Sequence, residues 1–112
     1  MTEGGEMSDY VLLYRGGKMP EGEAAQAAVM EAWGAWFGQL GAAVKDPGNP
    51  FTPTAKSISS DGSVSDGPAG SMASGYSIVQ ADSLDAAVAM AKGCPVLQGG
   101  AQISVFETFE VM

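Results

Sequence analysis

The stretch from Glu21 to Val44 constrains the fold of this chain most strongly, because it has the pattern of one long amphipathic helix. Pro20 and the glutamates that follow it favour a helix start, where free backbone N–H groups and the helix dipole attract carboxylates. Large apolar side chains then recur at steps of three and four residues, which places them along one stripe of the helix. They are Val29, Trp33, Trp36, Phe37, Leu40 and Val44. Gly41, or the turn Asp46-Pro47-Gly48, is expected to end the helix.

The aromatic side chains of this stripe have two interpretations. Trp33 and Trp36 can form a stacking platform for a ligand ring, or they can pack against a sheet as ordinary core. Aromatic rings bury a large apolar area, and a stripe at helical spacing usually faces a sheet. We therefore expect the stripe to belong to the core, covered by strands that form before and after the helix.

The remaining segments predict strands, a hairpin and a second helix. Apolar or alternating runs indicate strands at residues 10–14, 56–60, 76–80 and 102–111. Asp61-Gly62 predicts a tight turn, after which residues 63–65 return beside residues 56–60 as a small hairpin. Asp82 or Ser83 is expected to cap the second helix, which Gly93 ends. This order of elements is the βαββαβ pattern of a ferredoxin-like α+β fold with an extra β-hairpin.

In such a fold both helices cover one face of a four-stranded antiparallel sheet, and the other face needs a cover of its own. Residues 10–14 are apolar on both faces of their strand, and Phe106 or Phe109 adds further apolar area. A second copy that packs sheet against sheet would shield this surface from water, and a C2 homodimer is the commonest arrangement. The sequence therefore predicts a homodimer that packs sheet against sheet.

Length, charge and cysteine content narrow the classes of protein. A chain of 112 residues suits one domain, expected over residues 9–112, with residues 1–8 as a flexible tail. The net charge of −8 argues against nucleic acid and against anionic membranes as partners. No run of apolar residues is long enough to span a bilayer. The single cysteine, Cys94, and the lack of a signal-peptide pattern predict a reducing cytoplasm.

Several short motifs follow one another along the chain in an order that is similar to that of a known protein family. They are YVLLYRG near the start, AWGAWFGQLG in the helix, the Asp66-Gly67-Pro68 loop, GYSIVQADSLDAAVAMAKGCP and the closing VFETFEVM. Together they resemble YCII-related proteins, including their DGPF-motif branch, over nearly the whole chain after Met7. The resemblance implies a dimeric α+β barrel with a cleft between sheet and loops. It also implies that most members are uncharacterised, and that a few act as small-molecule lyases or isomerases similar to muconolactone isomerase, with a His–Asp pair.

The chain departs from this pattern at informative places. Ala69 stands where the DGPF branch has its phenylalanine, and Val96 stands where many YCII-related proteins carry histidine. The chain contains no histidine at all, so the His–Asp mechanism cannot be transferred. The fold, the dimer and a cleft are the properties that the resemblance still implies.

Two carboxylates are candidates for catalysis. Asp66 can act as a general base or ligand contact on the loop, or it can bond its own backbone in a turn before Gly67-Pro68. Glu107 interrupts the apolar side of the last strand. If it is buried, its pKa would rise and it could shuttle protons, whereas at a dimer edge it would simply be solvated.

Four further residues are candidates for ligand binding. Arg15 and Lys18 form the only basic cluster near a strand end, which suits either an anionic ligand or surface ion pairs. Tyr14 and Tyr76 can offer hydroxyl groups to a ligand, or pack their rings and expose only the tips. No residue set has the composition of a metal site, and no motif indicates a cofactor.

Three functional hypotheses follow. The first is a homodimer whose intersubunit cleft binds a small, anionic metabolite. The second is a lyase or isomerase that uses Asp66 or Glu107 as the acid–base group beside a tyrosine. The third is a structural or regulatory interaction module. A cleft lined by Arg15, Tyr76 and a carboxylate would favour the first two, and a buried carboxylate with a raised pKa would favour the second.

Overall fold

The computed structural model describes residues 7–18 and 20–110. Its elements follow one another along the chain as β1 (Ser8–Arg15), α1 (Glu23–Leu40), η1 (Gly41–Ala43), β2 (Val44–Asp46), β3 (Lys56–Ile58), β4 (Val64–Asp66), β5 (Ala73–Ala81), α2 (Leu84–Ala91), η2 (Pro95–Gly99) and β6 (Gln102–Glu107). The predicted tail, residues 1–8, lies outside the described residues up to position 6, and Ser8 already belongs to β1.

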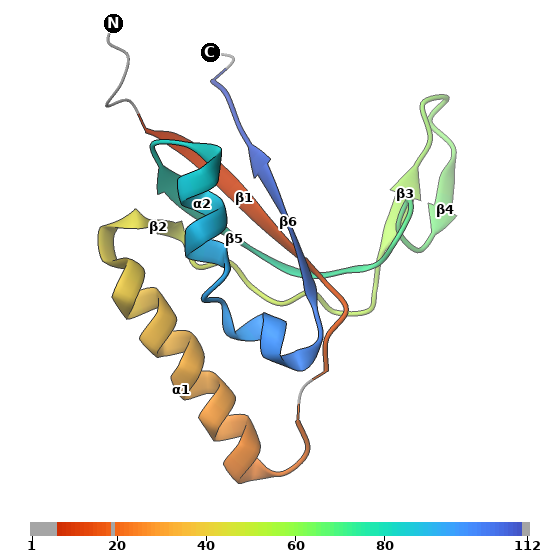
Figure 1. The fold of residues 1–112 in the computed structure, drawn as a ribbon. Coiled ribbons are helices and arrows are strands. Elements are labelled where there is room, and N and C mark those ends of the chain that lie inside the picture. The colour runs from red at the N-terminus through yellow and green to blue at the C-terminus, as the bar shows by residue number, and fades with distance from the viewer. Residues whose placement is uncertain (1–6, 19, 111–112) are drawn as a thin grey trace, which may run out of the picture.

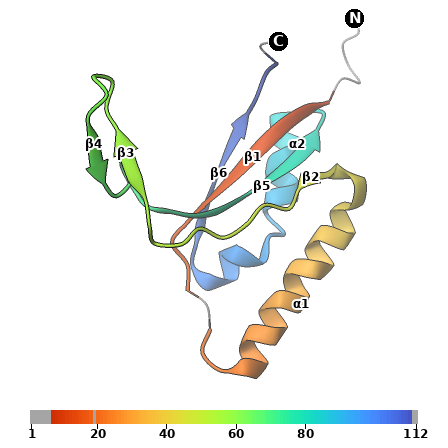
Figure 2. The same cartoon turned by 180° about the vertical axis from the view of Figure 1, so that it is seen from behind.

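The strands form two separate sheets. Four of them make an antiparallel sheet in the order β2-β5-β1-β6, and β3 and β4 make a two-stranded sheet of their own. Both helices lie on one side of the four-stranded sheet (Figures 1 and 2). The prediction of an α+β fold with two helices, a four-stranded antiparallel sheet and an additional hairpin is therefore confirmed.

Burial alternates along the two central strands as expected for a sheet that is covered on one side. In β1, Tyr10, Leu12 and Tyr14 are buried beneath the helices, whereas Val11 and Leu13 point to the other face and are only half-buried. The strand β5 repeats this pattern with a buried Val79 and half-buried neighbours. The side that faces the helices is called the covered face below, and the opposite side is called the open face.

The helix α1 is attached to the sheet through its aromatic stripe. Trp36 is buried, and its indole N–H donates a hydrogen bond to the Met90 carbonyl at 3.0 Å. Trp33, Phe37 and Leu40 pack against the same core, and the ring of Trp33 meets Tyr14 edge-on at a centroid distance of 5.6 Å. The expectation that the stripe belongs to the core is confirmed.

Of the two predicted ends of this helix, Gly41 is confirmed and the later turn at Asp46-Pro47-Gly48 is wrong. The helix ends at Leu40, because Gly41 takes a positive φ of 57° and the chain turns through η1. A residue without a Cβ atom adopts this backbone conformation at little cost, so Gly41 is the natural stop. Val44, the last residue assigned to the stripe, lies instead in the short strand β2.

The second strand of the main sheet was also assigned to the wrong segment. Residues 56–60 were expected to fill this place, but β2 pairs with β5 immediately after the helix, with Val44 opposite Val79. The chain then follows β5 through Pro47, Gly48 and Pro50. Prolines lack the N–H group needed to continue a ladder, so the pairing stops and the hairpin forms beyond it.

The C-terminal elements agree with the sequence except at the last strand. Ser83 caps α2, accepting a hydrogen bond from the Ala86 N–H at 3.0 Å. The strand β6 was expected to run to residue 111, but it ends at Glu107, opposite Tyr10 of β1. Thr108 extends the contact through its N–H and hydroxyl groups, which both donate to the Asp9 carbonyl.

Within the described residues, neither helix combines the length and the apolar character that crossing a bilayer demands.

Candidate functional site

The open face carries an apolar centre with polar groups at one end. Val11 and Leu13 on β1, Ile78 on β5 and Phe106 on β6 share this face, because strand pairing places Val11 opposite both Ile78 and Phe106. All are half-buried except Phe106, which is 50 % exposed. An apolar centre on a solvent-facing sheet is typical of a surface that meets another molecule.

Arg15 lies on the open face at the end of β1. Its guanidinium Nη1 donates a hydrogen bond to the Ser104 hydroxyl on β6 at 3.0 Å, and Ser104 pairs with Leu13. The hydrogen bond holds the guanidinium along the sheet and occupies one of its five N–H donors. Within the described part of the chain, Ser104 is the side chain that this guanidinium bonds, and a guanidinium with further N–H donors can bind an anion.

Tyr76 is next to Arg15 on the open face, one strand away, because it pairs with Leu13. Its hydroxyl donates to a carboxylate oxygen of Asp46 at 3.2 Å, and the negative charge of Asp46 raises the pKa of Tyr76. The other oxygen of Asp46 accepts the N–H of Gly48 at 2.8 Å. Asp46 thus fixes both the turn after β2 and the orientation of the tyrosine.

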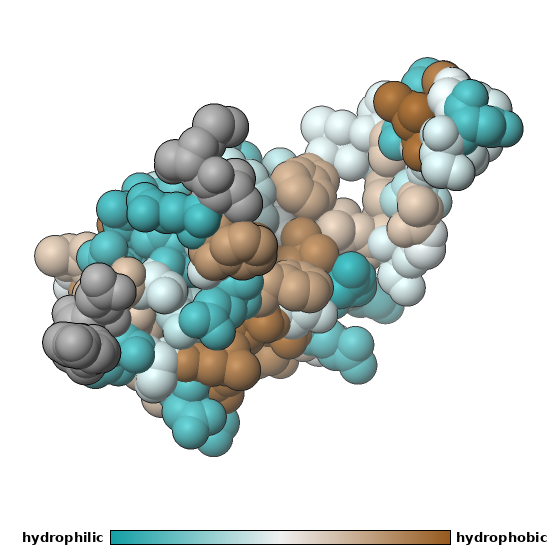
Figure 3. All heavy atoms as spheres, turned by 90° about the horizontal axis from the view of Figure 1, so that it is seen from above, coloured by the Kyte–Doolittle hydropathy of each residue, from teal (hydrophilic) through white to brown (hydrophobic). Residues whose placement is uncertain are grey.

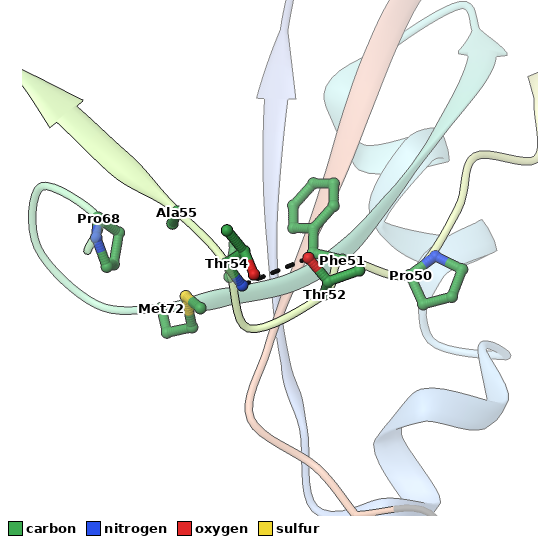
Figure 4. A pocket seen from close by; sticks show the side chains of 8 residues that line it. Pro50, Phe51, Thr52, Thr54, Ala55, Pro68 and Met72 are labelled. Atoms are coloured by element: carbon green, nitrogen blue, oxygen red, sulfur yellow. Dashed lines mark hydrogen bonds between the residues drawn. The ribbon is translucent and has the colours of Figure 1, made fainter. Parts of the chain in front are cut away.

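A hollow of about 390 Å³ opens beside this tyrosine. Phe51, on its wall, stacks on the ring of Tyr76 with 5.9 Å between the ring centroids. Figure 4 shows the lining, which is mostly apolar and comprises Pro50, Phe51, Thr52, Thr54, Ala55, Pro68, Met72 and Ala73. Ala73 pairs with Arg15, so the hollow and the guanidinium lie at the same end of the sheet.

Tyr14 lies on the covered face and cannot share a cleft with Tyr76. Its ring is buried, and its hydroxyl donates to Ser77 at 2.7 Å; the Ser77 hydroxyl donates in turn to the Pro47 carbonyl at 2.7 Å. Burial raises the pKa of Tyr14 well above its ordinary value. The arrangement is a buried structural network, in which each hydroxyl group has a partner.

The two proposed catalytic carboxylates are both exposed, Asp66 on the hairpin and Glu107 at the end of β6. Asp66 is exposed on the hairpin, where it forms an ion pair with Lys56 at 2.6 Å. Glu107 is exposed at the opposite end of β6 from Gln102, the residue that pairs with Arg15. Its charge contributes, after burial, to a raised pKa of the neighbouring Tyr10. Neither residue therefore has the buried setting that acid–base chemistry would require.

Lys18 and Cys94 have simpler surroundings. Lys18 is exposed, and its backbone N–H donates to the Gly99 carbonyl at 3.1 Å. Cys94 is buried, and burial raises the pKa of its thiol, so it is not a ready nucleophile. In the part of the chain that the structure describes, no three acidic or cysteine side chains gather as metal ligands do.

Of the six predicted residues, Arg15 and Tyr76 share the open face on neighbouring strands, and Tyr76 pairs with Leu13, two residues before Arg15. Sequence reasoning missed Asp46, Phe51 and Ser104, which complete their surroundings. Asp46 was assigned to a turn, and its first role is indeed the turn. Its second role depends on the pairing of β2 with β5, for which a three-residue strand gives almost no signal in the sequence.

A scan of family models and a search of curated proteins returned no match for this chain. The resemblance to YCII-related proteins therefore stays a prediction.

Proposed function

We propose that this protein is a homodimer in which two copies pack through their open faces, and that the cleft between them binds a small anionic metabolite. The observation that carries the proposal is the placement of Arg15 and Tyr76 on the same open face, at the edge of an apolar centre. The strand order β2-β5-β1-β6, with both helices on one side, supports a ferredoxin-like fold and the dimeric α+β barrel that the YCII resemblance implies.

The physical case for the dimer is the distribution of apolar surface. Phe51, Met72 and Phe106 are exposed around the open face, and Val11 and Leu13 in its centre are only half-buried. Water contact with such a continuous area costs about 25 cal/mol for each Å² left uncovered. A second copy removes this area from water on both molecules at once, because a C2 interface pairs the same surface of the two copies.

The anion would be held mainly by Arg15. Its guanidinium keeps free N–H donors after bonding Ser104, and a planar guanidinium binds a carboxylate through two parallel hydrogen bonds. The Tyr76 hydroxyl already donates its hydrogen bond to Asp46. The tyrosine would therefore contact the ligand mainly with its ring, together with the stacked ring of Phe51. This arrangement suits a small carboxylate with an apolar part.

A second candidate function is acid–base catalysis, as in a lyase or isomerase, and one observation favours it. Asp46 and Tyr76 form a hydrogen-bonded carboxylate–hydroxyl pair, and the Tyr76 ring stacks on Phe51, which lines the hollow. Such a pair can relay a proton if a substrate lies against it. The residues of this version are therefore Asp46 and Tyr76, in place of Asp66 and Glu107.

A thermal-shift screen of small aliphatic and aromatic carboxylates tests the binding proposal. We expect at least one compound to raise the melting temperature of the wild type and to lose this effect in Arg15→Ala. Lys92→Ala, at the C-terminal cap of α2 on the covered side, is the matched control and should respond like the wild type. If no compound stabilises the wild type, or Arg15→Ala responds equally, the anion site is wrong.

A further inference from the structure

The hairpin formed by β3 and β4, residues 56–66, is built as an independent arm. Its register places Lys56 opposite Asp66 and Ile58 opposite Val64. Because side chains alternate along a strand, these two pairs share one face of the arm, and Ser57 lies on the other.

The turn of the arm is well formed. Asp61 accepts hydrogen bonds from both the N–H and the hydroxyl of Ser63, at 2.9 and 2.7 Å, which lowers the pKa of its carboxyl group. The N–H of Ser59 donates to the Ser63 carbonyl at 2.8 Å. The arm is therefore a defined ribbon with a fixed register, and one of its faces presents an apolar pair.

No other part of the described residues 7–18 and 20–110 covers this apolar pair. Ile58 is 74 % exposed and Val64 is 60 % exposed, and the arm stands clear of the body in both ribbon views. The space-filling view from above shows the same separation (Figure 3). The radius of gyration is 16.0 Å, whereas a compact domain of this length has about 13 Å. An isolated two-stranded hairpin is at best marginally stable in water, so the arm needs support from another surface.

The arm and the open face lie on the same side of the sheet. In Figure 1 α2 is in front of the sheet and the arm recedes behind it, and Figure 2 shows the reverse. The arm leaves the body next to β5, at the end of the sheet where Pro50 pairs with Gly75. A molecule that covers the open face is therefore next to the arm, and the hollow lies at the root of the arm.

We propose that the arm of each copy packs on the second copy of this chain through Ile58 and Val64, and so encloses the cleft between the two open faces. The inference rests on the dimer of the proposed function and names the element that closes it. A second copy fits better than an unrelated partner, because one symmetric contact covers the open face and the arm of both molecules. The charged pair beside the apolar one, Lys56 and Asp66, is neutral as a unit, which limits the repulsion that a chain of charge −8 brings to self-association.

Sedimentation velocity over a dilution series tests the arm. The variant carries Ile58→Thr and Val64→Thr, which keep β-branched side chains suited to a strand but replace apolar groups with hydroxyls. We expect the dimer dissociation constant to rise at least about 100-fold, because four apolar side chains of the dimer lose their burial. Met30→Gln, at a helix position that is 63 % exposed, is the matched control and should leave the constant unchanged.

Hydrogen exchange on the wild type provides a reading that needs no variant. The arm amides should exchange slowly at concentrations where the dimer dominates and rapidly after dilution to the monomer. Equal exchange at both concentrations would overturn the arm contact.

The outcomes separate the arm from the dimer itself. An unchanged dissociation constant in the threonine variant, together with a weakened dimer in Phe106→Ser, would overturn the arm contact and leave the sheet-to-sheet dimer standing. It would also point to a different protein as the partner of the arm. A wild type that stays monomeric at every concentration would overturn the dimer, and the arm contact with it.

Discussion

The two faces of the four-stranded sheet differ in how completely their apolar side chains are shielded from water. On the covered face, Tyr10, Leu12 and Val79 have no more than 1 % of their surface exposed. Among the described residues, no fully buried side-chain nitrogen or oxygen atom lacks a hydrogen-bond partner. On the open face, apolar side chains remain half-exposed and the arm beside them is bare. The difference indicates that the covered face stabilises the monomer, and it is the reason for our proposal that the open face serves assembly and binding.

Removing one large aromatic ring from each face tests the different roles of the two faces with the largest expected effect. Trp36→Ala should lower the free energy of unfolding by about 3–5 kcal/mol, because it empties the core and leaves the Met90 carbonyl without its donor. Phe106→Ala should cost the monomer less than about 1 kcal/mol, because half of this ring is already exposed, yet it should weaken the dimer. Urea unfolding at protein concentrations below the dimer dissociation constant measures the free energy of unfolding of both variants as monomers. Equal losses would contradict the division of roles.

The turn after β2 connects the two faces and should be the next most sensitive. Gly48 has a positive φ of 74°, and an added Cβ atom would overlap the Tyr76 carbonyl oxygen. Gly48→Ala should therefore lower the free energy of unfolding by about 2 kcal/mol or more and displace Tyr76. Gly62→Ala, which also has a positive φ but open space around it, is the control for strain alone. If the two variants are equally destabilised, the close approach at Gly48 is irrelevant.

The buried hydroxyl network gives a smaller effect with a defined sign. Ser77→Ala leaves the Tyr14 hydroxyl without an acceptor and the Pro47 carbonyl without a donor, and should cost about 1–3 kcal/mol. Tyr14→Phe keeps the Ser77 to Pro47 bond and should cost less. In a double-mutant cycle by chemical unfolding, the combined variant should cost less than the sum of the two changes. Additive costs would show that the two hydroxyls do not interact.

The smallest predicted effect is a pH dependence of the covered face. Burial raises the pKa of the Cys94 thiol above its ordinary value of 9.0, so the folded state stays protonated where the unfolded state ionises. The folded state then binds more protons, and the free energy of unfolding should fall as pH rises from about 9. Tyr14, whose pKa is raised by burial, adds to the same slope from about pH 10. Cys94→Ala should flatten the first part of the slope in unfolding measured between pH 8 and pH 10, and an unchanged slope would exclude this cause.

Regular patterns allowed much of the covered face to be predicted. The spacing of three and four residues around Trp36 and the alternation in β1 and β5 directly indicate which side of each element is buried. The cap at Ser83 is a local hydrogen bond and was predicted correctly for the same reason. Such features depend on neighbours in the sequence and on one apolar side.

The candidate site was harder to predict, because it depends on pairing between distant segments. Tyr14 and Tyr76 look alike in the sequence, but their positions in the paired strands place them on opposite faces. The role of Asp46 beside Tyr76 depends on a strand of only three residues. Asp66 was predicted as a site residue only because of its loop motif, and it forms an ion pair with Lys56. Local signals locate these residues in loops and strands, whereas the register decides which of them meet.

The most direct test of the central claim, that a second copy covers the open face, is the mass of the native protein by light scattering at several concentrations. The proposal predicts a particle of twice 11.4 kDa that dissociates on dilution, and earlier dissociation for Phe106→Ser. A particle of 11.4 kDa at every concentration, identical for the wild type and the variant, would contradict it.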